Sequence, residues 1–134
     1  MILVDTSVWI DFFNRSPGPA GSELRRMIEE AEPFALTGVI VTEILQGLCQ
    51  EAHRIEGYLS LWEMLEPRGF FTYQEAAAIS RLGRSRGIRL TTIDTLIAAV
   101  ALERDAILFS LDKDFSQIAR LTPLRLYSLP DSVG

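Results

Sequence analysis

Cysteine and histidine are almost absent from this chain of 134 residues. Cys49 is the only cysteine, so the chain cannot form an internal disulfide, and this composition is typical of proteins from reducing compartments. His53 is the only histidine, which excludes a histidine-rich metal site and leaves one candidate for a serine–histidine–aspartate triad. We expect Cys49 to be a buried or half-buried core residue and His53 to be a structural or exposed one.

Long apolar runs are missing as well. No run approaches the roughly 20 residues that a membrane-spanning helix needs. The N-terminus begins at once with the strand-like run Met1–Val4 and shows no basic segment followed by a cleavage site. We therefore expect no signal peptide and a cytoplasmic location without membrane association. The 134 residues, of which 48% are hydrophobic, favour one domain over residues 1–134 with a core of its own.

Positive charge is the third scarcity. Lysine and arginine together number 13 against 18 acidic residues, which gives a formal net charge of −5 and by itself argues against nucleic-acid binding. Lys113 is the only lysine, and four of the arginines are concentrated in one stretch. Arginine forms bidentate contacts with phosphate, so this stretch is either a patch that faces a substrate or a solvated helix end. These arginines are Arg81, Arg84, Arg86 and Arg89.

Short apolar runs alternate with segments of helical periodicity along the chain. Four runs are predicted to be strands, at Ile2–Val4, Phe34–Leu36, Ile107–Ser110 and Leu126–Ser128. The first and third are almost continuously apolar, as is typical of parallel strands that are buried on both faces. Strands separated by helices predict an α/β fold with a mainly parallel sheet.

The predicted helices have candidate caps and one candidate binding surface. Ser22 is predicted to cap the helix that follows it, and Thr72 and Glu75 match a capping box that opens a helix over about residues 72–86. Another helix is predicted over about residues 52–65. Apolar candidates for core packing or for a protein-binding groove are Tyr58, Leu59, Leu61 and Trp62. We favour core packing for Leu59 and Trp62.

Four acidic residues stand where an apolar run ends or a helix begins. Asp5 and Asp112 each follow a predicted strand, and ligands of parallel sheets bind at the carboxyl ends of the strands. Asp94 lies in the first turn of a predicted helix, and Glu43 lies at the edge of the apolar face of another. Each position has a structural explanation of its own: the helix dipole for Asp94, solvent exposure for Glu43 and helix capping for Asp112.

Together, four such carboxylates point to a cation. Two like charges about 6 Å apart repel by roughly 3 kcal/mol at an effective dielectric constant of about 20, and four of them form six such pairs. If the side chains converge, they either protonate or hold a metal ion. Ligands that are oxygen atoms only favour Mg²⁺ or Mn²⁺. Such an ion lowers the pKa of bound water and stabilises charge on a phosphoryl oxygen, which permits phosphodiester hydrolysis without histidine.

The segments around these acids resemble the PIN-domain family and, within it, the VapC-type ribonuclease toxins of prokaryotic toxin–antitoxin modules. The four motifs have the order and spacing of the family and span nearly the whole chain, which makes the resemblance specific. The motifs are Leu3-Val4-Asp5-Thr6-Ser7-Val8, Val41-Thr42-Glu43-Ile44-Leu45-Gln46-Gly47, Asp94-Thr95-Leu96-Ile97-Ala98-Ala99 and Ser110-Leu111-Asp112-Lys113-Asp114-Phe115.

The resemblance implies a three-layer α/β/α sandwich, a metal-dependent endoribonuclease, a homodimer and a cognate antitoxin protein as partner. It also implies an acidic metal-site quartet with hydroxyl side chains beside it. The quartet is Asp5, Glu43, Asp94 and Asp112, and the hydroxyl residues are Thr6, Ser7 and Ser110. Asp114 matches a more variable acid of the family, which either assists the metal or caps the following helix, and we favour capping.

These residues lead to a mechanistic hypothesis. One or two Mg²⁺ or Mn²⁺ ions are bound by Asp5, Asp94 and Asp112, with Glu43 as a direct ligand or through water. An activated water attacks the RNA phosphodiester in line, and either Glu43 or Asp94 orients or deprotonates it. The arginine-rich stretch positions the phosphates. RNA is the favoured substrate over DNA.

Two other interpretations remain open. A receiver-like signalling domain also combines a parallel sheet with an acidic Mg²⁺ pocket, but it needs a buried lysine after a later strand, and Lys113 directly follows Asp112. A non-catalytic PIN-like module that binds RNA or protein would keep the fold without the acids, whereas all four acids are present here. Metal-dependent thermal stabilisation distinguishes this second interpretation from a nuclease.

Overall fold

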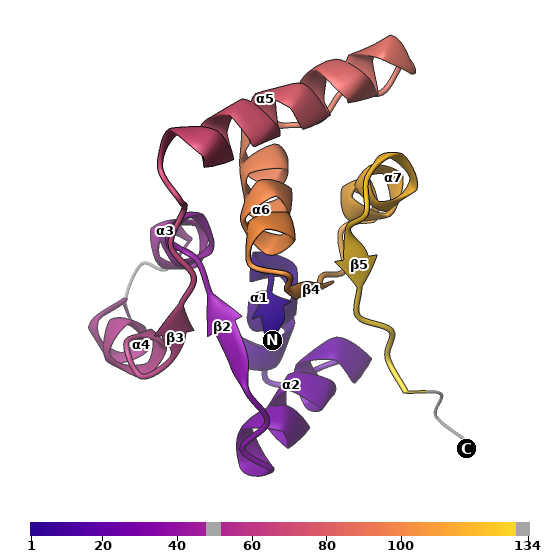
Figure 1. Cartoon of the computed structure of the whole chain (residues 1–134). Coiled ribbons are helices and arrows are strands. Elements are labelled where there is room, and N and C mark those ends of the chain that lie inside the picture. Colours follow the sequence, from indigo (N-terminus) through magenta and orange to yellow (C-terminus); the bar gives the residue numbers. More distant parts are fainter. Residues whose placement is uncertain (48–51, 131–134) are drawn as a thin grey trace.

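Five parallel strands form one sheet, and helices connect them (Figure 1). The computed structural model describes residues 1–47 and 52–130, so the expectation for Cys49 lies outside the described residues. The strands are β1 Ile2–Val4, β2 Phe34–Leu36, β3 Glu63–Met64, β4 Ile107–Phe109 and β5 Arg125–Leu126. The helices are α1 Thr6–Phe13, α2 Pro19–Glu29, α3 Gly38–Gln46, α4 Ala52–Leu59, α5 Phe70–Ser85, α6 Thr92–Glu103 and α7 Lys113–Leu121.

The order of the strands divides the helices into two layers. The sheet has the spatial order β3-β2-β1-β4-β5, so the chain moves outward from β1 to β3, returns to β4 beside β1, and continues to β5. Because crossovers between parallel strands are right-handed, these opposite directions place α1–α4 on one face of the sheet and α5–α7 on the other. The contacts agree, since α1 packs on α2 and α5 packs on α6. The fold is the α/β/α sandwich that the family resemblance implied, built on the parallel sheet that the sequence pattern predicted.

The central strands are buried on both faces, as their apolar runs predicted. Leu3, Val4 and Leu108 are fully inaccessible to solvent, and β1 pairs with β4 so that Val4 lies opposite Phe109. On α1, the buried Trp9 packs against Phe34 of β2 with 5.9 Å between the ring centroids. Within the described part of the chain, no helix is both long and apolar enough to cross a membrane.

Two helices begin earlier than predicted, and both predicted caps are wrong. α2 begins at Pro19 with Gly18 as N-cap, because proline fits the first helical position, and Ser22 is an exposed residue inside the helix. α5 begins two residues before Thr72. The hydroxyl of Thr72 is buried and donates to Glu103 of α6 at 2.6 Å, so this residue joins two helices instead of capping one.

The predicted helix over residues 52–65 is shorter, and a strand follows it. α4 ends at Leu59, whose side chain is buried as expected, and Trp62 is half-buried against Phe34 with 4.7 Å between the ring centroids. Leu61, by contrast, is 72% exposed. β3 was not predicted from the sequence because it has only two residues and both are exposed. His53 is an exposed residue of α4, as expected.

The two C-terminal strands differ from their predicted bounds by one or two residues. β4 ends at Phe109 and not at Ser110, and β5 covers Arg125–Leu126 and not Leu126–Ser128. Strand pairing sets these limits, because β4 and β5 are joined only through the pairs that Ile107 and Leu108 form. The release of Ser110 from the strand leaves its hydroxyl free to turn toward the end of β1.

Asp11, near the end of α1, forms hydrogen bonds with the backbone at the start of α2. Its carboxylate accepts hydrogen bonds from the amides of Gly18 at 3.0 Å and Gly21 at 2.7 Å. The two helices come so close here that a Cβ atom on Gly21 would lie 2.7 Å from the backbone carbon of Asp11. Glycine is therefore required at this crossing, which holds α1 in place behind the end of β1.

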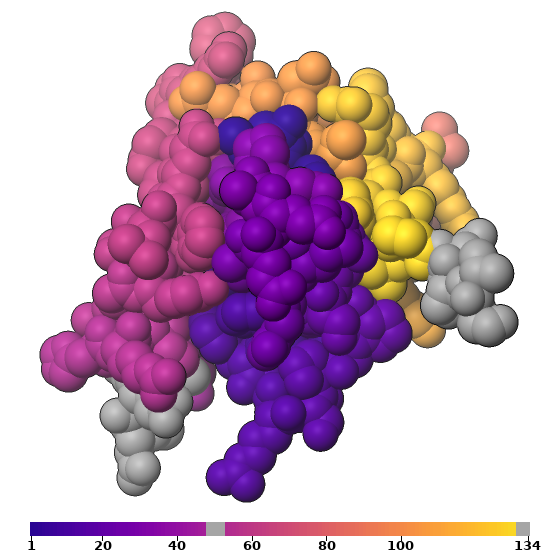
Figure 2. Space-filling view, turned by 90° about the horizontal axis from the view of Figure 1, so that it is seen from below, coloured from indigo at the N-terminus to yellow at the C-terminus, as the bar shows by residue number. Residues whose placement is uncertain are grey.

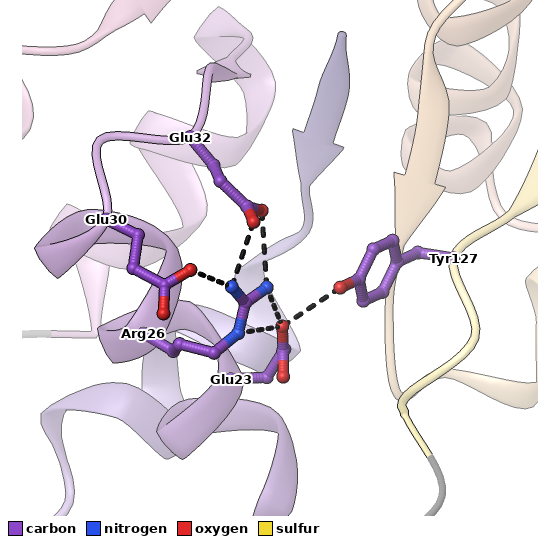
Figure 3. A network of polar contacts seen from close by, with 5 residues as sticks. All are labelled: Glu23, Arg26, Glu30, Glu32 and Tyr127. Atoms are coloured by element: carbon purple, nitrogen blue, oxygen red, sulfur yellow. Dashed lines mark hydrogen bonds and ion pairs between the residues drawn. The ribbon is translucent and has the colours of Figure 1, made fainter.

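A network of charged side chains joins α2 to the segment that follows β5. Arg26 of α2 contacts Glu23 and also pairs with Glu30 at 2.5 Å and Glu32 at 2.9 Å (Figure 3). The hydroxyl of Tyr127, just after β5, donates to Glu23 at 3.0 Å. The view from below shows the yellow C-terminal segment beside the violet residues of this region (Figure 2). The network thus ties the last segment of the chain to α2.

Candidate metal site at the carboxyl edge of the sheet

The candidate site lies where β1 and β4 end side by side. β1 leads into one helical layer and β4 into the other, so the crossovers diverge at this point and leave an opening at the carboxyl ends of the strands. Asp5 directly follows β1, and its amide donates to the carbonyl of Phe109 at 2.9 Å. Ser110 directly follows β4. The topology thus brings Asp5 and Ser110, which are 105 residues apart in sequence, to one place.

Asp5 is buried and firmly held. It is the N-cap of α1 and is 5% exposed. Its Oδ2 atom accepts hydrogen bonds from the Ser7 hydroxyl at 2.9 Å and the Ser110 hydroxyl at 2.7 Å, with the Ser7 amide at 3.5 Å. These hydrogen bonds restrict rotation of the carboxylate. Asp5 is therefore held in one orientation directly after β1.

The same two hydroxyls also hold the loop that carries Asp112. The amide of Leu111 donates to the Ser7 hydroxyl at 2.9 Å, and the amide of Asp112 donates to the Ser110 hydroxyl at 3.0 Å. The two hydroxyl oxygens are 3.3 Å apart. Each serine thus links a carboxylate on one strand end to the backbone on the other, which is the placement that the sequence predicted for hydroxyl residues beside the acids.

Glu43 reaches the site from α3. The Thr6 hydroxyl donates to its Oε1 atom at 2.8 Å, and Thr6 is the residue directly after Asp5. Glu43 is half-buried, in agreement with its predicted place at the edge of the apolar helix face. The partnership between Thr6 and Glu43 was not foreseen, because 37 residues separate them and only the fold brings α3 against α1.

Three carboxylates from two segments form the most crowded part of the site. One oxygen each of Asp94, Asp112 and Asp114 lies within 4.8 Å of the others. Asp94 is half-buried in the first turn of α6, where its amide donates to the N-cap residue Thr91 at 3.1 Å. Burial, repulsion from Asp112 and a hydrogen bond with Asp114 raise the pKa of Asp94 to about 7. Without a cation, this cluster therefore retains a proton near neutral pH.

The capping role that we favoured for Asp114 is wrong. The N-cap of α7 is Asp112, whose Oδ1 atom accepts a hydrogen bond from the Asp114 amide at 2.9 Å. Asp114 lies in the first helical turn, half-buried, with its carboxylate toward Asp94 and Asp112. The sequence signal was ambiguous because aspartate is favourable both at the N-cap and in the first turn.

The predicted arginines do not join the acidic cluster. Arg81 and Arg84 of α5 line a hollow of about 370 Å³ that also includes Thr92 at the start of α6. Arg86 is the C-cap residue of α5, and Arg89 is exposed in the loop before α6. Across residues 1–47 and 52–130, none of the four forms an ion pair. They remain available to a ligand at the surface.

The donor set fits a hard divalent cation. The carboxylate oxygens that lie within 4.8 Å of one another belong to Asp94, Asp112 and Asp114, with no histidine or cysteine among them. Asp5 and Glu43 lie outside this group and are joined to neighbouring site residues through Ser110 and Thr6. In the described part of the chain, no basic side chain forms an ion pair with any of these acids. Oxygen ligands with excess negative charge suit Mg²⁺ or Mn²⁺. Burial first, and then repulsion from Asp112, raises the pKa of Asp94, in accord with negative charge that has no basic partner nearby.

Comparison with known proteins shows which family the chain resembles over most of its length. The family profile described as PIN domain matches residues 2–121. Ribonuclease VapC11 of Mycobacterium tuberculosis is 36% identical over 132 residues, which cover 96% of this chain and 98% of that protein.

Solved structures agree with this placement. A toxin–antitoxin complex from Klebsiella pneumoniae contains a chain with a TM-score of 0.63 and 25% identity, covering 94% of this chain and 100% of that one. VapC20 of Mycobacterium tuberculosis, described as a sarcin–ricin loop cleaving toxin, has a TM-score of 0.68 at 19% identity and covers 93% and 99% of the two chains. The latter likeness shows the fold alone. With both the family profile and a 36% identical relative extending over most of its length, the chain belongs to the PIN domain family.

Proposed function

We propose that this protein is a metal-dependent endoribonuclease and the toxin of a type II toxin–antitoxin pair. The observation that carries the proposal is the group of three carboxylates, Asp94, Asp112 and Asp114, which has no basic partner among the described residues and lies beside the ends of β1 and β4. The ribonuclease name of a 36% identical relative supports the same reaction. A receiver-like domain lacks support, because Lys113 is an exposed residue of α7.

Each acidic residue has a part in the proposed site. Asp5, Asp94 and Asp112 would hold one or two Mg²⁺ or Mn²⁺ ions, with Glu43 and Asp114 as direct ligands or partners through water. When bound, such an ion supplies charge stabilisation on the phosphoryl oxygen and lowers the pKa of water. Glu43, fixed by Thr6, and Asp94, which is half-buried, are the two candidates for orienting the attacking water and accepting its proton.

The arginines of α5 provide a path for the RNA backbone. Successive residues of an α-helix are about 100° apart, so Thr92 and Asp94 lie on nearly opposite sides of the first turn of α6. Arg81 and Arg84 share the hollow on the Thr92 side. We propose that they bind phosphates of the strand beyond the scissile bond, with Arg86 and Arg89 as further contacts. Their bidentate geometry suits phosphate, which offsets the acidic net charge locally.

Cleavage of a pool of single-stranded and structured RNA tests the activity. We expect cleavage with Mg²⁺ or Mn²⁺, none with chelator, and a decrease on the order of 10²-fold or more in Asp5→Asn, since several kcal/mol of charge stabilisation depend on the site. Asp105→Asn is the matched control, because Asp105 is exposed and its positive φ of 51° is tolerated by asparagine. Equal cleavage by wild type and Asp5→Asn would contradict the proposal.

A groove at the far end of α1 is the proposed antitoxin contact. It has a volume of about 550 Å³ and is lined by apolar side chains, among them Phe12, Tyr58 and Leu61, and by Arg25 and Arg54. Both arginines are exposed, and the lining contains no acid, so the groove suits an apolar segment that carries acidic residues. The related toxin–antitoxin complex supports a protein partner.

Binding of the co-expressed antitoxin tests this contact. We expect Leu61→Ser and Arg54→Glu to weaken the complex in calorimetry while RNA cleavage by the free toxin stays unchanged. Leu111→Ser, at another exposed leucine, is the control. Unchanged affinity in both variants would place the antitoxin elsewhere.

The exposed aromatic residues at the start of α5 support a homodimer. Phe70 and Phe71 are 77% and 78% exposed, which is costly for large apolar side chains unless another surface covers them. We propose that a second copy packs on this face. Light scattering coupled to gel filtration should give a dimer for the wild type and a monomer for Phe70→Ser/Phe71→Ser, whereas a monomeric wild type would contradict the proposal.

A further inference from the structure

Several carboxylates of the acidic site have one oxygen occupied and the other free. Asp5 accepts its side-chain hydrogen bonds on Oδ2, from Ser7 and Ser110. Glu43 accepts the hydroxyl of Thr6 on Oε1. Across residues 1–47 and 52–130, no hydrogen bond reaches Oδ1 of Asp5 or Oε2 of Glu43. Each of these two acids therefore keeps one carboxylate oxygen without a hydrogen bond.

We propose that Thr6, Ser7 and Ser110 are positioning residues that make the site select Mg²⁺ or Mn²⁺ over Ca²⁺. This inference rests on the metal site of the proposed function. Ca²⁺ takes six to eight oxygen ligands and readily uses both oxygens of a carboxylate, whereas Mg²⁺ requires near-ideal octahedral geometry with one oxygen from each group. Hydroxyls that occupy the second oxygen of Asp5 and Glu43 remove the bidentate mode and leave the geometry that the smaller ions prefer.

The packing around Asp5 explains why this restriction holds. The carboxylate is 5% exposed, so no water can replace the two hydroxyl donors cheaply if it rotates. The hydroxyls themselves are anchored, because Ser7 accepts the Leu111 amide at 2.9 Å and Ser110 accepts the Asp112 amide at 3.0 Å. Rotation of Asp5 would break a connected set of bonds, not a single one.

One oxygen of Asp112 is also occupied by a hydrogen bond, but the donor is a backbone amide and not a hydroxyl. Its Oδ1 atom accepts the amide of Asp114 at 2.9 Å, because the residue is the N-cap of α7. No hydroxyl is involved, so this bond cannot be removed by a side-chain substitution at a neighbour. Asp5 and Glu43 are therefore the positions at which the proposal can be tested without changing an acid.

Calorimetric affinities for Mn²⁺ and Ca²⁺, measured separately on the intact protein, give the test. Loss of a partner that orients a metal ligand costs about 10–100-fold in affinity. We expect Ser110→Ala to weaken Mn²⁺ binding by about 10-fold or more while Ca²⁺ affinity holds or increases, so that the Mn²⁺/Ca²⁺ affinity ratio falls by at least about 10-fold. Ser110→Thr keeps the hydroxyl and should keep the ratio.

Further variants distinguish a change in metal selectivity from a loss of folding. Thr6→Val removes the hydrogen bond to Glu43 at a half-buried position. Like Ser110→Ala, it should lower the Mn²⁺/Ca²⁺ affinity ratio. Thr42→Val is the matched control, because the Thr42 hydroxyl bonds only to the Gly38 carbonyl on the same helix as Glu43. Circular dichroism melting establishes that each variant is folded.

The outcomes separate this inference from the proposed function. An unchanged Mn²⁺/Ca²⁺ ratio in both Ser110→Ala and Thr6→Val overturns the inference, including the case in which both affinities fall equally, because the hydroxyls then only stabilise the site. If Asp5→Asn binds both ions as tightly as the wild type, the metal site and the proposed function fail as well. If Asp5→Asn loses binding while the ratio stays constant in the hydroxyl variants, only the inference fails.

Discussion

Two clusters of carboxylates in this protein differ in whether the protein itself supplies a cation. Around α2, Glu23, Glu30 and Glu32 share the guanidinium of Arg26. This contact, opposed by burial, lowers the pKa of Glu23. At the carboxyl edge, Asp94 meets two further carboxylates, and burial and repulsion raise its pKa to about 7.

The difference teaches how to distinguish structural acids from functional ones. Glu23 is 8% exposed and Asp94 is half-buried, so burial alone does not separate them. What separates them is charge compensation within the chain. In the α2 cluster one guanidinium contacts all three glutamates, whereas the edge cluster has no basic partner among the described residues. A fold keeps such excess negative charge when a ligand provides the balance. Substitutions that change the charge of the two clusters should therefore have different effects on metal binding and on the pH dependence of stability.

The largest expected difference is in the response to metal. A ligand that binds only the folded state stabilises it by about 2.7 kcal/mol at a concentration 100 times its Kd. We expect Mg²⁺ or Mn²⁺ to raise the Tm of the wild type and to leave Asp112→Asn nearly unaffected, because asparagine still caps α7 but lacks the charge. Differential scanning calorimetry with and without chelator measures both.

Glu30→Gln serves as the control for that experiment, since it removes one acid from the α2 cluster. It should keep the full metal response. If Glu30→Gln loses the response and Asp112→Asn keeps it, the assignment of the two clusters is reversed.

The next effect is in the pH dependence of the metal-free protein. Because the pKa of Asp94 is raised from 3.8 to about 7, ionisation of this group opposes folding, and stability falls as the pH rises through that window. The full shift corresponds to roughly 4 kcal/mol, which solvent screening of a half-exposed group reduces to about 1–2 kcal/mol. Asp94→Asn should therefore stabilise the chelated protein at pH 8 and not at pH 4.

The contribution of Glu23 to stability changes with pH in the opposite direction to that of Asp94. Its folded pKa is lowered, so its contribution is present above the ordinary pKa of 4.5 and is lost as the pH falls through the lowered value. Urea unfolding of the wild type, Asp94→Asn and Glu23→Gln between pH 3 and pH 8 resolves the two windows. A wild-type profile that does not change between pH 5 and pH 8 would be incompatible with an uncompensated edge cluster.

The sequence identified the edge cluster better than it identified the α2 cluster. Asp5 and Asp112 stood out because each follows an apolar strand, and the parallel order of such strands brings their ends together. Glu23, Arg26 and Tyr127 carried no such signal. Tyr127 is 104 residues from Glu23, and only the completed sheet brings the C-terminal segment beside α2.

Local competition explains what the sequence missed within the predicted elements. Ser22 and Thr72 are good N-cap residues, yet Pro19 begins α2 earlier and Thr72 has a partner on another helix, Glu103. Asp114 was assigned to capping because Asp112 and Asp114 are equally suitable by residue type. The choice between them depends on the backbone at the end of β4, where Asp112 has the extended conformation of an N-cap, with φ of −80° and ψ of 125°.

The smallest expected effect comes from Arg26→Lys, which keeps the charge of the α2 cluster and changes its geometry. A guanidinium presents a planar fork of donors, and here it contacts Glu23, Glu30 and Glu32 at once. An ammonium is a point charge that cannot span the three carboxylates. We expect a modest decrease in Tm and no change in metal affinity, measured by thermal melting and calorimetry. Arg120→Lys, on the exposed side of α7, is the control. Equal Tm values for the two variants would mean that this cluster contributes only as ordinary surface charge.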